Sequence, residues 1–372
     1  MQSTSRITNL FLIPLLWLAN SCASDRPPSG GPVDATPLQV LFSDPAPSAV
    51  QVSTERIQLT FNHDISVRQL LNTVIISPSI GEYDMGVSGR KMEIKGFKPL
   101  QQERTYIITL DKKLSDINGR TFAFPYSMAF STGALIDNGV ISGKVINRDC
   151  SPATNALIVA FAEDPKNSGT KNLMQREPDY FVQADRSGAF SLQHLSKGLY
   201  RIIAVNDRNG DLHINAATEE IGLCSRAVVS TATSDILFRF SEVRQKSSNP
   251  PPRPAREVVT PAETGSLSGI CFTSAPYVVV EASSLTASYR TTASLDRNGA
   301  LHYLFPALPA GSYTISAFIP SDGKNPKPER PWNPGSVEPF QPAEPFGFYP
   351  EKVTVRPRWT TEHIDIRILT SK

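Results

Sequence analysis

One stretch of the chain has the residue types and spacing of a calcium ligand set. In NDRNGDLHINAATEE, Asp207, Asn209 and Asp211 stand at positions 1, 3 and 5, and carboxylate and amide oxygens are the ligands that Ca²⁺ prefers. The rest of the loop departs from the pattern, because Leu212 replaces the glycine at position six and Glu219 comes one residue late. The alternative, which we favour, is a turn in which Asn and Asp side chains bond their own backbone. Calcium is therefore a weak candidate, and the sequence suggests no other cofactor.

A second stretch concentrates aromatic side chains among prolines near the end of the chain. The candidate ligand-binding residues are Trp332, Phe346, Phe348, Tyr349 and Trp359. Aromatic rings on a loop stiffened by proline could stack on sugar rings or contact a protein partner. In the alternative, the loop folds over its own domain and its rings cover a sheet edge.

No familiar catalytic or zinc-binding motif is present. The five histidines are scattered without HExxH spacing, no GxSxG motif occurs, and the four cysteines include no CxxC pair. We expect Cys150, Cys224 and Cys271 to be free or buried thiols, with a disulfide between Cys150 and Cys224 as the alternative. The sequence therefore predicts a protein that is not an enzyme, against the alternative of a hydrolase whose catalytic groups meet only in the folded chain.

The fourth cysteine, Cys22, follows an apolar run that is too short to cross a membrane. Residues 10–18 are nine residues long, whereas a transmembrane helix needs ~20, and with Arg6 before them they match the core of a signal peptide. Small or polar residues at 19–21 then precede Cys22. This arrangement resembles the lipobox of bacterial lipoproteins, in which the leader is removed before a cysteine that carries diacylglycerol. The resemblance implies that Cys22 is lipidated and that the membrane is a partner; the alternative is an ordinary secreted protein.

The residues after Cys22 favour an extended tether. Residues 22–37 hold four prolines and two glycines, and proline fixes φ and lacks a backbone donor. Ala23 is not the aspartate that retains lipoproteins in the inner membrane of enteric bacteria. The resemblance therefore implies the outer membrane, either its periplasmic face or the cell surface.

The composition bounds the remaining possibilities. The chain has 372 residues, of which 40% are hydrophobic and 19% charged, and this is typical of a globular protein with several domains. The net charge is +2 and no run of Lys and Arg stands out, so nucleic acid is not expected as a partner. The sequence does not indicate the oligomeric state.

Alternating apolar and polar residues predict β-strands along most of the chain. In RIQLTF, residues 56–61, Ile57, Leu59 and Phe61 share one face, and in FPYSMAF the same pattern begins at Phe124. A period of two over four to eight residues is typical of half-buried strands. We therefore predict an all-β protein made of three consecutive β-sandwich domains.

The first of these domains resembles a known family. The segments IQLTFNHDISV, KMEIKGFKPLQQERTYIITL and FSTG follow the pattern of bacterial Ig-like domains of the S-layer type. The resemblance covers residues 26–134, and such domains occur near the start of many cell-envelope lipoproteins. It implies an architecture rather than an activity.

The rest of the chain contains an internal repeat. The aligned pairs are DRSG at 185–188 with DRNG at 296–299, GLY at 198–200 with GSY at 311–313, and SG at 142–143 with SG at 268–269. This pattern is similar to carboxypeptidase-regulatory-like sandwiches, also called transthyretin-like and grouped with the starch-binding-like, or carbohydrate-binding-like, folds. The second copy is divergent, because Leu301 stands where the first has Phe190 and a proline-rich insertion follows.

These observations predict a non-catalytic lipoprotein of the cell envelope. It would present its Ig-like and transthyretin-like modules for protein or polysaccharide binding, or serve as a structural scaffold; the alternative is a carbohydrate-binding protein that uses the aromatic loop at 332–359. The predicted organisation is a signal peptide (1–21), a tether (22–37), an Ig-like domain (38–134), a transthyretin-like sandwich (135–244), a proline-rich linker (245–263) and a second such sandwich (264–372).

Overall fold

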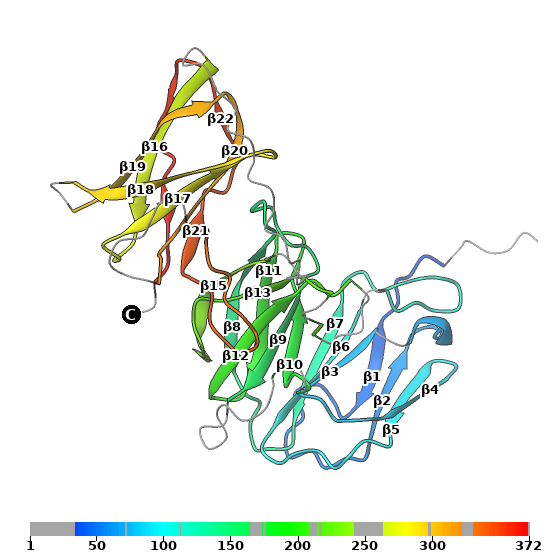
Figure 1. Cartoon of the computed structure of the whole chain (residues 1–372). Helices are drawn as coiled ribbons and strands as arrows, with labels where there is room; N and C mark the ends of the chain where they lie inside the picture. The colour runs from blue at the N-terminus through cyan, green and yellow to red at the C-terminus, as the bar shows by residue number, and fades with distance from the viewer. Residues whose placement is uncertain are drawn as a thin grey trace, which may run out of the picture. The chain divides into compact units, whose positions relative to one another are not determined.

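The computed structural model describes residues 34–70, 73–111, 113–163, 173, 176–208, 214–215, 218–241, 263–296, 299–321 and 330–370. The chain divides into two compact units, Met1–Pro37 and Leu38–Lys372. The strands all belong to the second unit (Figure 1), which confirms the all-β prediction. Among the described residues, no helix is both long enough and apolar enough to cross a membrane.

The first sandwich consists of two sheets around one core. Its first sheet has the order β1-β2-β5-β4, with β1 at Val40–Asp44, β2 at Arg56–Phe61, β4 at Asp84–Ser88 and β5 at Lys91–Lys95. Its second sheet has the order β3-β6-β7, with β3 at Val74–Ser77, β6 at Thr105–Leu110 and β7 at Tyr126–Ser131. Ile57, Leu59 and Phe61 are fully buried between the sheets, as their alternation in β2 predicted. A short 3₁₀ helix, η1 (Val67–Gln69), follows β2.

The alternation at the other end of this domain is misleading. Strand β7 begins only at Tyr126, so Met128 and Phe130 are buried whereas Phe124 is 81% exposed. Pro125 explains the difference, because it cannot donate a ladder hydrogen bond and therefore stops the strand from extending back. The prediction that Phe124 shares the buried face is wrong.

The second sandwich also has two sheets. The order β10-β9-β12-β13, with β14 paired to β12, faces the order β11-β8-β15, and a single cluster of apolar side chains fills the space between them. The strands are β8 (Gly139–Ile146), β9 (Leu157–Ala162), β10 (Tyr180–Gln183), β11 (Ala189–Leu195), β12 (Leu199–Val205), β13 (Ile221–Leu223), β14 (Val229–Ser230) and β15 (Thr233–Arg239).

The third sandwich repeats the main pairings of the second within one continuous sheet. Its order is β21-β20-β17-β18-β19-β16-β23, with β22 paired to β20 and β24 paired to β16, because β18 pairs with both β17 and β19. Strand β16 pairs with β19 as β8 pairs with β11, and β17 pairs with β20 as β9 pairs with β12. The strands are β16 (Thr264–Phe272), β17 (Val278–Ser283), β18 (Ser288–Leu295), β19 (Leu301–Pro309), β20 (Gly311–Phe318), β21 (Phe346–Phe348), β22 (Val353–Val355), β23 (Thr360–Thr361) and β24 (Ile366–Arg367). They enclose a separate apolar core.

The positions that align in sequence make the same hydrogen bonds in both sandwiches. The Asp185 carboxylate accepts the Ala189 amide at 3.0 Å, and the Asp296 carboxylate accepts the Ala300 amide at 2.8 Å. The hydroxyl of Tyr200 donates to the carbonyl four residues back at 2.7 Å, and that of Tyr313 does so at 2.8 Å. Burial raises the pKa of Tyr313 to about 12, so this hydroxyl stays protonated and remains a donor at neutral pH. The repeated motif therefore specifies repeated local structure.

Candidate functional site

The second and third sandwiches share a buried apolar cluster. Ile146 and Cys150 of the second sandwich pack with Val279, Phe318 and Phe346 of the third. The Cys150 amide donates to a backbone carbonyl in the turn after β8 at 3.0 Å, which holds the thiol in this cluster. Burial raises the pKa of Cys150 to about 11. The thiol is therefore uncharged at neutral pH and acts as an apolar packing group.

A loop of the third sandwich, residues 330–345, extends this contact, and we call it the clasp loop. Trp332, Val337, Phe340 and Ala343 pack against the side chains of β9, β12 and β13 that point away from the core of the second sandwich. The Arg201 guanidinium lies 4.2 Å from the centre of the Phe340 ring, a distance typical of a cation–π contact. The clasp loop thus covers a sheet face that would otherwise expose a row of apolar residues.

A buried carboxylate organises the clasp loop. Glu344 is 3% exposed, and its Oε1 accepts hydrogen bonds from the Arg330 guanidinium at 2.6 Å and from the Ser321 amide at 2.7 Å. Its Oε2 accepts the Asn333 amide at 3.0 Å, and its backbone carbonyl accepts the Trp332 indole at 2.9 Å. Because a buried carboxylate is costly unless it is paired, this set of partners selects one conformation of the loop.

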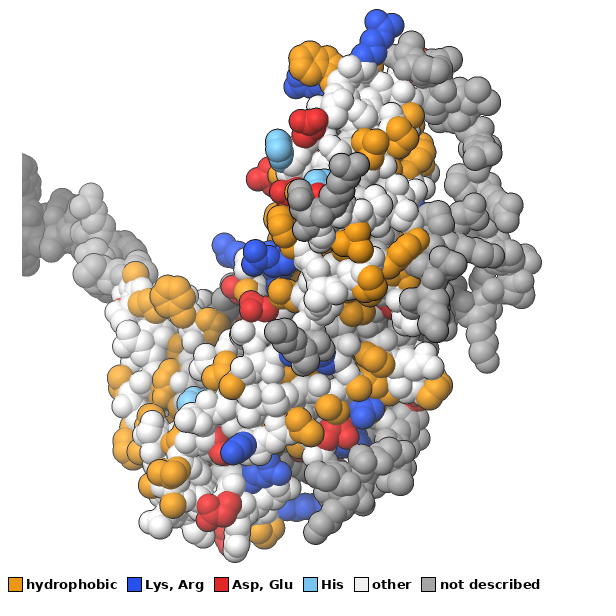
Figure 2. Space-filling view, turned by 90° about the vertical axis from the view of Figure 1, so that its left-hand side faces the viewer, with side chains coloured by type: hydrophobic (Ala, Val, Ile, Leu, Met, Phe, Trp, Pro, Cys, Tyr) orange, Lys and Arg blue, Asp and Glu red, His pale blue; other side chains and the backbone are white. Residues whose placement is uncertain are grey.

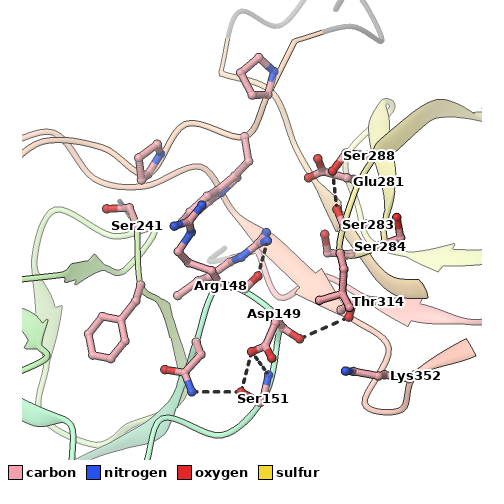
Figure 3. A pocket seen from close by; sticks show the side chains of 18 of the residues that line it. Arg148, Asp149, Ser151, Ser241, Glu281, Ser283, Ser284, Ser288, Thr314 and Lys352 are labelled. Carbon is pink, nitrogen blue, oxygen red and sulfur yellow. Dashed lines mark hydrogen bonds between the residues drawn. The ribbon is translucent and has the colours of Figure 1, made fainter. Parts of the chain in front are cut away.

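Between the two sandwiches lies a cleft of about 890 Å³ (Figure 3). One wall comes from the turn after β8 and from the end of β15, and the opposite wall comes from β17, β18 and β20, with the clasp loop closing one side. Eight of the lining residues carry a hydroxyl group: Ser151, Ser241, Ser283, Ser284, Ser288, Ser312, Thr314 and Ser316. Figure 3 shows Arg148, Asp149 and Ser151 on the first wall and Ser283, Ser288 and Thr314 on the second.

Charged groups are placed on both walls of the cleft. The lining carries four cations against three carboxylates, and two of those carboxylates are held in ion pairs, Glu281 with Arg290 at 2.7 Å and Glu220 with Arg208 at 3.2 Å. The third, Asp149, accepts the Ser151 hydroxyl at 2.6 Å. This hydrogen bond, with the nearby charge of Lys352, lowers the pKa of Asp149.

The two walls are joined at one point by a polar contact. The Thr314 hydroxyl of β20 donates to the Asp149 carbonyl at 3.3 Å. On the first wall, the Arg239 guanidinium donates to the Arg148 carbonyl at 2.8 Å and lies 5.4 Å from the centre of the Trp332 ring. The cleft can therefore offer hydroxyls, cations and one indole to a polar ligand from walls whose spacing is held by the clasp loop.

The structure brings three of the five aromatic residues singled out in the sequence into one apolar cluster, namely Trp332, Phe346 and Phe348. Trp332 is half-buried and lines the cleft, and Phe346 packs edge-on against it with ring centres 5.1 Å apart. Phe348 and Tyr349 are half-buried, whereas Trp359 is 68% exposed. The insertion packs on the neighbouring sandwich, which neither interpretation of the sequence included.

The other candidate residues lie partly or wholly outside the described chain. Asp207 is half-buried beside β12, while Asn209, Asp211 and the lipidation candidate Cys22 are outside the described residues. Within the described ranges, no group of three His, Cys, Asp or Glu residues could hold a metal ion. The calcium and lipidation assignments therefore remain predictions. Cys150, Cys224 and Cys271 are free and buried, as expected.

Sequence reasoning missed the cleft because its residues come from segments far apart in the chain. A signal did exist for the clasp loop, since ALIVAFAED is apolar on both faces and the structure buries both faces of β9. One face of such a strand lies on its own core, and the other must be covered by a further element. Nothing in the local pattern indicates that the cover comes from the next domain.

The comparison with known families concerns the first sandwich. Residues 34–132 match the family model described as bacterial Ig-like domain. This match agrees with the resemblance found in the sequence, and we refer to the first sandwich as the Ig-like domain below. No curated protein matches the chain.

Solved structures align with the chain at low similarity. The Bacillus anthracis TIE protein is 11% identical, with 92% of this chain and 60% of that chain covered and a TM-score of 0.17. A crystal structure of part of alpha-2-macroglobulin from Escherichia coli is 12% identical, with 78% and 95% covered and a TM-score of 0.21. The N-terminal part of the bacterial S-layer protein SbsC is 13% identical, with 55% and 44% covered and a TM-score of 0.21. At these TM-scores the alignments carry no inference about this chain.

Proposed function

We propose that this protein is a non-catalytic lipoprotein of the cell envelope that binds an acidic polysaccharide in the cleft between its second and third sandwiches. The observation that carries the proposal is the lining of the cleft, which holds eight hydroxyl side chains and four cations against three carboxylates. Sugar hydroxyls pair with serine hydroxyls and charged side chains. The cations of the lining outnumber its carboxylates by one, so an acidic chain complements the cleft better than a basic one. The Ig-like match at residues 34–132 supports an envelope or structural role.

The cleft is tested by a charge reversal at its rim. Lys352 is an exposed lining residue, so Lys352→Glu should leave the fold intact while repelling an acidic chain. We expect retention of polygalacturonate in affinity electrophoresis to weaken about tenfold, equivalent to ~1.4 kcal/mol, whereas neutral dextran should be retained weakly by both forms. Lys197→Glu makes the same charge change on an exposed lysine of the second sandwich that does not line the cleft and should have no effect.

Each alternative predicts a different outcome. Equal loss of retention in the two lysine variants would mean that only net charge matters and that the cleft is not the site. Retention of neither polysaccharide would favour a scaffold that holds its modules at a distance from the membrane. Trp332→Ala does not separate these cases, because Trp332 packs in the contact between the two sandwiches and its loss should destabilise both.

Anchoring is tested separately in cells. The short apolar leader followed by Cys22 supports lipidation, so Cys22→Ser should move the protein from the membrane fraction to the soluble fraction. Protease treatment of intact cells then distinguishes the two faces of the outer membrane, because cleavage within 245–263 requires access from outside. The membranes are washed in high salt, which weakens any electrostatic surface contact, and a Cys22→Ser chain that still stays in the membrane fraction would contradict the lipoprotein assignment.

A further inference from the structure

One end of the Ig-like domain is built from the beginning of the domain and from loops that follow β2, β4 and β6. The Leu38 amide donates to the Thr121 carbonyl at 3.1 Å, the Ser66 amide to the Ser115 carbonyl at 3.0 Å, and the Ile117 amide to the Asp64 carbonyl at 2.9 Å. We call this region the tether end: Leu38 with the loops at 62–70, 88–91 and 111–125. The backbone hydrogen bonds hold its loops in one arrangement beside the point where the domain begins.

The loops of the tether end expose large apolar side chains. Val67 is 64% exposed, Ile117 is 65% exposed and Phe124 is 81% exposed. Each belongs to a loop or to η1, so its side chain is not needed to fill the core. Exposed apolar side chains that gather in one region mark an interaction surface. Large apolar side chains are exposed elsewhere on the protein as well, and Figure 2 shows hydrophobic side chains on the face that it draws.

The charge of the tether end is mainly positive on its outside. Among the described residues of these loops, Arg68, Arg90, Lys91 and Lys113 are exposed, against the exposed carboxylate of Asp64, which pairs with Arg90 at 3.7 Å. A further carboxylate, that of Asp116, is turned inward, where it is 1% exposed and accepts the Arg120 guanidinium at 2.6 Å. Cations are therefore presented to the surroundings together with the apolar side chains.

We infer that the tether end rests on the anionic surface of the membrane that anchors the chain. Val67, Ile117 and Phe124 would enter the headgroup region while the exposed cations contact lipid phosphates. A protein partner is less suited to this surface, because protein interfaces are depleted in lysine and centre on a contiguous packed patch. The inference rests on the proposed anchoring, since residues 23–37 limit the distance between lipid and domain to roughly 45 Å of extended chain.

Vesicle binding by the chain without its lipid tests this inference directly. The mature chain from residue 22, carrying Cys22→Ser, is mixed with vesicles of phosphatidylglycerol or of phosphatidylcholine and sedimented. We expect binding to the anionic vesicles that falls steeply with salt, and a loss of about tenfold in the triple variant Val67→Ser, Ile117→Ser, Phe124→Ser. The matched control replaces three exposed leucines elsewhere, Leu135, Leu295 and Leu304, which are 80%, 56% and 50% exposed, and it should bind as the parent does.

Three outcomes would overturn the inference. The first is that the chain does not bind anionic vesicles. The second is that the triple variant and the leucine control lose vesicle binding equally. The third is that the chain forms a dimer in solution that the triple variant abolishes, because the surface would then join two copies. Since every protein in this experiment lacks the lipid, its failure is independent of the cell fractionation that tests Cys22. If the Cys22→Ser chain is released from the membrane fraction but does not bind vesicles, the proposed lipid anchor is supported and only the proposed docking surface is rejected.

Discussion

The second and third sandwiches share two main strand pairings, β8 with β11 as β16 with β19, and β9 with β12 as β17 with β20, and differ most visibly in one connection. In the second, residues 206–220 join β12 to β13, and in the third, residues 319–345 join β20 to β21. The first connection contains the Asp- and Asn-rich stretch with calcium-like spacing, and the second contains the clasp loop. Two features that appear unrelated in the sequence therefore occupy equivalent places in the repeated fold.

Both connections are closed by a buried glutamate near their ends. The Glu219 carboxylate, 4% exposed, accepts the Asn215 amide at 2.9 Å before β13 begins, and Glu344 receives the hydrogen bonds of the clasp loop before β21 begins. The comparison shows that the same pairing of neighbouring strands accommodates connections of different length and composition, which is typical of loops on a rigid scaffold. In the third sandwich, this connection packs against the neighbouring domain.

The largest loss of stability is expected when the buried carboxylate of the clasp loop, Glu344, is removed. Glu344→Ala leaves Arg330 and the Ser321 and Asn333 amides without this acceptor, and removal of one partner from a buried, hydrogen-bonded charge pair costs about 3 kcal/mol or more. Urea unfolding of the mature chain, followed by tryptophan fluorescence, should record that loss and an earlier transition for the part that contains Trp332.

The control for this prediction lies in the same loop. Glu338 is exposed, so Glu338→Ala should change the free energy of unfolding by less than ~0.5 kcal/mol. If Glu344→Ala costs less than ~1 kcal/mol, water replaces the lost acceptor and the clasp loop is held by its apolar contacts alone.

Patterns carried by neighbouring residues allowed the fold to be predicted. Alternation identified β2 because the faces of a strand repeat every two residues, and the repeated Asp and Tyr positions identified both copies because their hydrogen bonds are local. Phe124 shows the limit, since a single proline ended the pattern that the surrounding residues continued.

The candidate site could not be predicted in the same way. Ser288 and Arg148 line one cleft but are separated by the whole of the linker and parts of two domains. An isolated serine carries no periodic signal, and the destination of the clasp loop depends on which apolar face remains uncovered after each sandwich has formed. The position of the clasp loop is therefore determined by the surfaces of the folded domains and cannot be predicted from any short segment of the sequence.

A smaller loss of stability, equal in the second and third sandwiches, is expected when their aligned glycines are replaced by alanine. In the structure, a Cβ at Gly143 would lie 2.0 Å from the Ile236 carbonyl oxygen, and one at Gly269 would lie 2.1 Å from the Ile364 carbonyl oxygen. Both contacts are with backbone, which cannot rotate away, so Gly143→Ala and Gly269→Ala should each destabilise by about 1–3 kcal/mol. Chemical denaturation of the two variants under the same conditions measures the change in the free energy of unfolding for each.

Gly86 provides the matched control, because it also lies in a strand and a Cβ there would meet nothing within 4 Å; Gly86→Ala should be neutral or slightly stabilising. Unequal losses at the two aligned positions would sharpen the comparison. Gly143 faces Ile236, which pairs with it in the parallel ladder of β8 and β15 directly after a register shift, whereas Ile364 lies between β23 and β24, outside any strand. A smaller cost at Gly269 would mean that the third sandwich, while retaining the motif, tolerates a shift in backbone that the second does not.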